Sequence, residues 1–100
     1  MTLNGIEIPR EQIASFCRER GILRLSLFGS ILRSDFGPAS DVDVLVEFRP
    51  GVRVGLSFAR MQNELSEIFG RNVDLNTPGF LSAYFREEIL KEAVVQYDTA

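Results

Sequence analysis

Apolar residues recur at helical spacing in three stretches of the chain. In the first, Ile13, Phe16 and Cys17 share one face between Pro9, which suits the start of a helix, and Gly21, which suits its end. The same reasoning predicts three helices, which cover residues 9–20, residues 56–69 and, from residue 81 or 82, the stretch up to residue 92.

Shorter apolar runs between these helices predict strands over residues 22–28, 41–48 and 73–75. In the clearest of them, Asp41, Asp43, Leu45 and Glu47 point to one side, and the intervening apolar residues point to the other. Residues 93–97 either continue the last helix or form a final edge strand. Because strands and helices alternate, we expect an α/β fold, a small mixed sheet with helices packed on one side, in a single domain over residues 1–100.

Composition excludes several classes of protein. The formal net charge of -3 lacks the basic surplus that nucleic-acid binders use, so no direct nucleic-acid partner is expected. The chain has no histidine, which removes Ser/His and Cys/His nucleophiles and the usual zinc sites. The one cysteine, Cys17, forms no internal disulfide and reads as a small buried hydrophobe. No apolar run is long enough to span a membrane, and we expect a cytoplasmic protein.

Carboxylates on the predicted strands are the first candidate chemistry. Asp41 and Asp43 lie on the same side of one strand, about 7 Å apart, and can converge on one point. Asp74 joins them if its short strand lies beside theirs; the alternative places it in a turn before Asn76. Oxygen ligands of this kind suit Mg²⁺ or Mn²⁺, and three acids can hold two ions about 3.5–4 Å apart, as in phosphoryl-transfer sites.

A small-residue bend upstream of the acids is the candidate phosphate site. Gly29 allows close approach of a phosphate, Ser30 offers a hydroxyl, and Arg33 lies one turn further on. The simpler alternatives are a plain strand-ending turn and a solvated Arg33. Ser40, just before the first acid, either contributes to the site or only shapes the loop.

The ordered set of Gly29-Ser30, ten intervening residues, Asp41-Val42-Asp43 and then Asp74 resembles the DNA polymerase beta-like nucleotidyltransferase superfamily. More closely, the chain is similar to the minimal nucleotidyltransferases (MNT), the antitoxins paired with HEPN-domain toxins. Arg33 matches the arginine of the family's Gly-Ser-x-x-Arg element, Ser40 matches the serine before the first acid, and residues 78–97 resemble the family's C-terminal segment. Ser34 departs from the glycine that often follows the arginine.

The resemblance implies a polymerase beta-like fold and transfer of AMP from ATP, with two Mg²⁺ ions or Mn²⁺, to a hydroxyl. The implied acceptor is a tyrosine of a HEPN toxin with which the chain forms a hetero-oligomer. The resemblance also implies that the catalytic metal ligands are Asp41, Asp43 and Asp74. It implies that the nucleotide-binding residues are Gly29, Ser30, Arg33 and Ser40. Composition and spacing alone reach only metal-dependent phosphate chemistry. Two alternatives remain: an antitoxin that neutralises its partner by binding alone, and the catalytic module of a multi-chain transferase acting on a small molecule.

Overall fold

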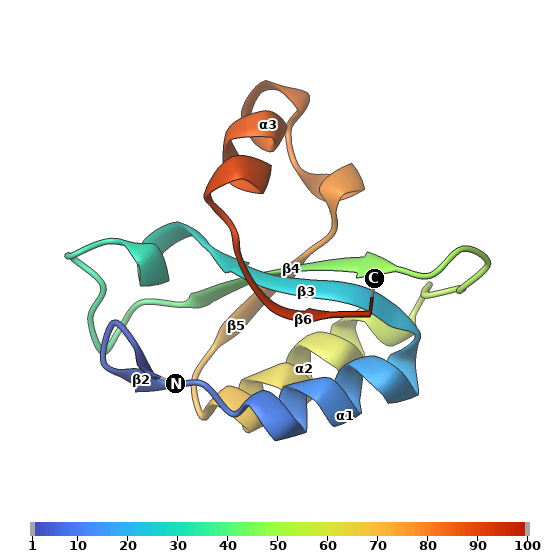
Figure 1. Ribbon diagram of the computed structural model, residues 1–100, viewed down its shortest axis with the longest axis horizontal. Helices are drawn as coiled ribbons and strands as arrows, with labels where there is room; N and C mark the ends of the chain where they lie inside the picture. Colours follow the sequence, from blue (N-terminus) through green and yellow to red (C-terminus); the bar gives the residue numbers. More distant parts are fainter. Residues whose placement is uncertain (1, 100) are drawn as a thin grey trace.

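The computed structural model describes residues 2–99, whose helices and strands follow one another as Figure 1 shows. In chain order they are β1 (Thr2–Leu3), β2 (Ile6–Glu7), α1 (Arg10–Arg20), β3 (Ile22–Phe28), the 3₁₀ helix η1 (Gly29–Leu32), β4 (Val42–Phe48), α2 (Ser57–Phe69), β5 (Val73–Asn76), the 3₁₀ helix η2 (Pro78–Phe80), α3 (Ala83–Glu92) and β6 (Val94–Asp98).

The main sheet has four strands in the order β5-β4-β3-β6. β3 lies in the middle and pairs antiparallel with both β4 and β6. β4 and β5 are parallel, and α2 makes the crossover between them. Two of the predicted acids, Asp43 and Asp74, lie on this parallel pair, and the third, Asp41, immediately precedes β4.

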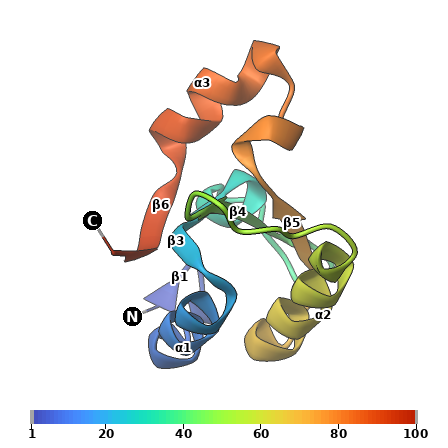
Figure 2. The same cartoon turned by 90° about the vertical axis from the view of Figure 1, so that its right-hand side faces the viewer.

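α1 and α2 cover one face of this sheet, as the two views show (Figures 1 and 2). Every second residue of β4 faces them: Val42, Val44 and Val46 are fully buried. Burial of such side chains stabilises the fold by roughly 1.5–3 kcal/mol each. The other central members of this core are Ile13, Phe16, Cys17, Leu25, Leu27, Met61, Leu65, Phe69, Val73 and Leu75.

The opposite face of the sheet carries neither α1 nor α2, although Ser26 and Leu45 on that face are buried. α3 stands beyond it in both views, and none of its residues is buried (Figures 1 and 2). The expected packing of helices on one side therefore holds for α1 and α2, whereas α3 projects away from the sheet.

The mixed α/β fold expected from the sequence is confirmed, and the structure decides the open alternative at the C-terminal end. Residues 94–98 form the edge strand β6 rather than a longer helix. Asp41 lies immediately before β4, one residue outside the strand predicted for it. The small β1–β2 hairpin was not predicted, although its Asn4-Gly5 turn, with both residues at positive φ, is a known hairpin signal.

No helix within residues 2–99 has the length and apolar character needed to cross a membrane.

Candidate active site

Two of the predicted acids lie side by side on paired strands. In the parallel pairing of β4 and β5, Asp43 is the register partner of Asp74. Adjacent strands are about 4.8 Å apart, and side chains paired in register point to the same face. The residues flanking both acids are buried in the core, so the two carboxylates stand on the face turned away from α1 and α2. Asp74 therefore lies within a strand and not in a turn.

The strand that carries Asp74 is held from its outer side as well. The N–H groups of Val73 and Leu75, which point away from β4, donate to side chains of α2. Ser66 Oγ accepts from Val73 at 3.0 Å, and Gln62 Oε1 accepts from Leu75 at 2.9 Å. Asp74 is fixed between these two anchored residues, which restricts the backbone that places its carboxylate.

The Gly29-Ser30 bend packs directly against Asp43. Gly29 follows Phe28, the register partner of Asp43, and has a φ of 72°. A Cβ at this position would lie 3.1 Å from Asp43 Cγ and overlap one carboxylate oxygen. The backbone N–H of Ser30 donates to the Asp43 carboxylate, and Ser30 Oγ donates to the carbonyl oxygen of Asp41 at 3.1 Å. The bend and both acids of the Asp-x-Asp pair therefore form one contact group.

Burial raises the pKa of Asp43 above its ordinary value, and the negative charges of Asp74 and Asp41 raise it further. The Ser30 N–H and the Arg33 guanidinium oppose this shift in the pKa of Asp43 by stabilising the carboxylate. The three acids thus act on one another electrostatically, as a shared cation site requires. Arg33 is exposed, yet it lies near enough to Asp43 to act on its charge.

The donor set fits a hard divalent cation, because it offers carboxylate oxygens without histidine or thiolate and a carboxylate whose charge is disfavoured by its acidic neighbours. Within residues 2–99, no three acidic or cysteine side chains lie close enough to hold one ion in their present conformations. Asp41 and Asp74 are both exposed. Exposed side chains of this kind are free to rotate, so the present conformations do not rule out a shared ion.

Ser40 is engaged within its own loop. Its Oγ accepts a hydrogen bond from the N–H of Gly37 at 3.1 Å, and its N–H donates to the carbonyl oxygen of Gly37 at 3.0 Å. These contacts support the loop-shaping alternative for Ser40.

Two side chains that hold the site from outside were missed by the sequence analysis. Asn4 Nδ2 donates to the carbonyl oxygens of Ile31, at 3.1 Å, and Arg33, at 2.6 Å. Arg71 Nη2 donates to carbonyl oxygens of the loop that precedes Asp41. The Asn4-Gly5 pair is a signal for a turn, but no signal in the sequence pointed to the contacts that Asn4 and Arg71 make with the site.

A hollow of about 440 Å³ adjoins the bend, and a further acid, Glu92, lines it. Its lining residues are Gly29, Leu32, Arg33, Glu92 and Val94. Gly29, which packs against Asp43, is one of the residues that line this hollow, so the hollow adjoins the bend that contacts the acid.

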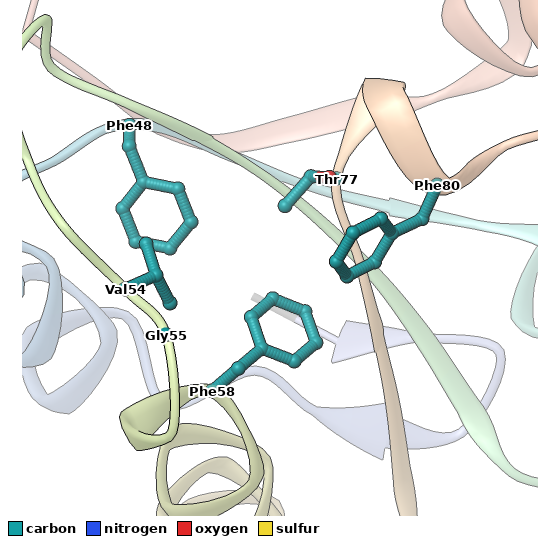
Figure 3. A pocket seen from close by; sticks show the side chains of 6 residues that line it. All are labelled: Phe48, Val54, Gly55, Phe58, Thr77 and Phe80. Carbon is teal, nitrogen blue, oxygen red and sulfur yellow. The ribbon is translucent and has the colours of Figure 1, made fainter.

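A second hollow, of about 360 Å³, has a different character. Figure 3 shows apolar side chains turned toward one another between β4, the start of α2 and η2. The rings of Phe58 and Phe80 meet edge to face, with their centroids 5.2 Å apart. The lining residues are Phe48, Val54, Gly55, Phe58, Thr77 and Phe80. Because no charged side chain is among them, this hollow is not the catalytic centre.

Paired carboxylates on a sheet face, with a Gly-Ser bend packed against one of them, define a site of the nucleotidyltransferase class. The chain belongs to the nucleotidyltransferase-domain family, which matches residues 10–95. It is 37% identical over 92 residues to the "Putative protein adenylyltransferase MJ0435" of Methanocaldococcus jannaschii, covering 92% of this chain and 97% of that protein. It is 32% identical over 95 residues to the protein adenylyltransferase MntA of Thermococcus cleftensis, covering 94% and 95%.

Solved structures agree with this assignment. One described as "putative minimal nucleotidyltransferase" is 35% identical and superposes with a TM-score of 0.71 over 85% of this chain and 86% of that one. A toxin-antitoxin structure with AMP-PNP shares the fold at 17% identity, with a TM-score of 0.72 over 90% and 73% of the two chains. Another with the same fold, at 17% identity and a TM-score of 0.66 over 91% and 71%, is a tri-AMPylated Shewanella oneidensis HEPN toxin in complex with MNT antitoxin. The resemblance to minimal nucleotidyltransferases is confirmed.

Proposed function

We propose that this chain is an antitoxin enzyme that transfers AMP from ATP, with Mg²⁺, to a hydroxyl group of a HEPN-domain toxin. The observation that carries the proposal is the contact of the Gly29-Ser30 bend with Asp43, whose register partner is Asp74. This arrangement brings a candidate polyphosphate-binding bend to the candidate metal ligands. The relative MntA, named a protein adenylyltransferase, supports the same chemistry.

The chain's own residues divide the work. Asp41, Asp43 and Asp74 hold the metal, and Asp43 is the central ligand because it touches the bend and lies beside Asp74. Mg²⁺ bound there supplies charge that lowers the pKa of the attacking hydroxyl and neutralises the leaving pyrophosphate. Ser30 and Arg33 orient the triphosphate from the other side. In this assignment Ser40 contributes indirectly, through the loop that precedes Asp41.

A protein partner is favoured because η2 and α3 expose several large apolar side chains. Four side chains of η2 and α3 are strongly exposed: Phe80 at 67%, Tyr84 at 85%, Phe85 at 53% and Leu90 at 44%. Exposed apolar groups on successive elements are typical of interaction surfaces. The toxin-antitoxin complexes that share this fold support a HEPN toxin as the occupant. We place the reaction in the cytoplasm, where ATP is available.

Labelled ATP tests the proposal. The purified chain, Mg²⁺ and the HEPN-domain partner are incubated with ATP labelled at either the α- or the γ-phosphate. Transfer of AMP puts the α-label on the partner and leaves the γ-label in pyrophosphate. Asp43→Asn should abolish transfer by at least 100-fold, while Glu67→Gln, an exposed acid on α2, should leave it unchanged. Absence of α-label on a folded partner in the wild-type reaction refutes the proposal.

A second candidate, neutralisation by binding alone, is favoured by the same exposed surface of η2 and α3. A double variant, Asp41→Ala with Asp43→Ala, separates the two functions in cells that express the toxin. Loss of protection with retained toxin binding supports catalysis. Full protection by the double variant supports occlusion.

A further inference from the structure

The segment between η1 and β4 leads into the first acid, Asp41, and hydrogen bonds within the segment give it its shape. We call residues 34–40, which end just before Asp41, the Asp41 loop. Its second half is a turn in which Ser40 and Gly37 exchange two hydrogen bonds, one through the Ser40 hydroxyl. Such a turn fixes the shape of the loop. It does not fix where the loop lies relative to β5, which carries Asp74.

Arg71, two residues before β5, makes that connection. Its Nη2 donates to the carbonyl oxygen of Gly37 at 2.6 Å and to that of Ser40 at 2.8 Å. Its guanidinium carbon lies 4.5 Å from the centre of the Phe36 ring. The next residue, Asn72, accepts the N–H of Val42 at 2.9 Å. Asp41 is thus placed between two anchored neighbours, both held by the chain just before β5.

Packing alone does not account for an arginine at this position. Arg71 Nε is buried without a hydrogen-bond partner, which is unfavourable. None of the ion pairs found among residues 2–99 involves Arg71. An apolar side chain would cover Phe36 without the desolvation cost. What only a long donor supplies here is the pair of hydrogen bonds to the loop carbonyl groups.

We propose that Arg71 is a positioning residue for the active site, which sets the backbone of Asp41 relative to Asp74 by holding the Asp41 loop. In this role Arg71 acts through the carbonyl oxygens at both ends of one turn. The inference rests on the proposed function, because AMP transfer is the reaction whose rate Arg71 is expected to affect. Misplacement of a reacting group by about 1 Å can lower a rate roughly 100-fold, so the effect belongs in kcat.

The test compares three substitutions. Arg71→Met keeps the packing over Phe36 and removes the donors, and Arg71→Lys restores a cationic donor. Arg20→Met is the matched control, because Arg20 also lies over a phenylalanine, Phe16, and forms an ion pair with Glu64 away from the acids. For each protein we measure the melting temperature, kcat and KM for ATP in AMP transfer, and amide hydrogen exchange across residues 36–42.

Arg71→Met should lower kcat at least tenfold with KM for ATP within threefold of the wild type, and should speed exchange in residues 36–42. Arg71→Lys should recover most of the lost kcat, and Arg20→Met should leave both kcat and that exchange unchanged even where it lowers the melting temperature. A kcat for Arg71→Met within twofold of Arg20→Met, or unchanged exchange in residues 36–42, overturns the inference. If the wild-type chain transfers no AMP, the proposed function fails, and the exchange measurement still decides whether Arg71 holds the loop.

Discussion

The contact between Gly29 and Asp43 can be isolated by one substitution and its control. Gly29→Ala and Gly70→Ala place a methyl group on two glycines with nearly the same positive φ, 72° and 70°. Both variants pay the same strain of a left-handed alanine, about 1–2 kcal/mol. At Gly70 nothing lies within 4 Å of the new Cβ, whereas at Gly29 it meets the Asp43 carboxylate. The difference in melting temperature and activity between the two variants therefore measures the effect of the close contact between residue 29 and Asp43.

Gly29→Ala should lower the free energy of unfolding more than Gly70→Ala does, because the Asp43 carboxylate is displaced. The new Cβ would lie 3.1 Å from Asp43 Cγ, below the 3.5–4.0 Å of a normal carbon contact, so the carboxylate has to move. Moving it draws the carboxylate away from the Ser30 N–H that stabilises its charge, and the loss of such a contact costs on the order of 1 kcal/mol. For a domain of this size, each kcal/mol lowers the melting temperature by about 4–8 °C.

Thermal unfolding and AMP transfer provide the two readouts. Gly29→Ala should melt at least 4 °C below Gly70→Ala and lose AMP transfer by roughly 100-fold, because the displaced carboxylate is the central metal ligand. Gly70→Ala should retain wild-type activity. Equal melting temperatures and equal activities for the two variants would refute the close approach that the site depends on.

Three further outcomes are expected. Millimolar Mg²⁺ with ATP should raise the melting temperature of the wild type but not of Asp43→Asn, because ions bound to the folded state stabilise it; equal shifts in thermal scans would contradict the metal site. In EDTA, Asp43→Asn should melt above the wild type at neutral pH. The raised pKa of Asp43 means that the folded state loses stability as pH rises through it, so the gap should close below about pH 4 in a series of melts. Finally, burial raises the pKa of the Cys17 thiol to about 12, so a thiol reagent should label it only upon unfolding, as read by mass spectrometry.

The sequence encodes the main elements and the acids because side-chain type and spacing carry them. Alternation along residues 42–48 fixed which face Asp43 occupies, and the apolar neighbours of Asp74 placed it on a strand. The boundary at Asp41 shifted by one residue, as the ends of elements commonly do.

The supporting contacts were not predictable in the same way. Arg71 and Asn4 donate to backbone carbonyl oxygens 27–34 residues away. Because every residue has a carbonyl group, the residue type does not indicate which one accepts. The position of α3 was also beyond the pattern, because its apolar residues satisfy helical spacing whether they face the sheet or solvent. Tertiary packing decides whether the apolar residues of α3 are buried, and in this structure Phe85 and Leu90 remain exposed.

The side chains of Gln62 and Ser66 on α2 have a consequence for the behaviour of the protein at high concentration. By taking the outward N–H groups of β5, they leave that border of the sheet without free donors at Val73 and Leu75, so another chain cannot add a strand there. The opposite border, β6, has no such cover from α2, and Val95 on it is 45% exposed. Self-association through strand addition would therefore start at β6, on the side of the sheet remote from Asp74.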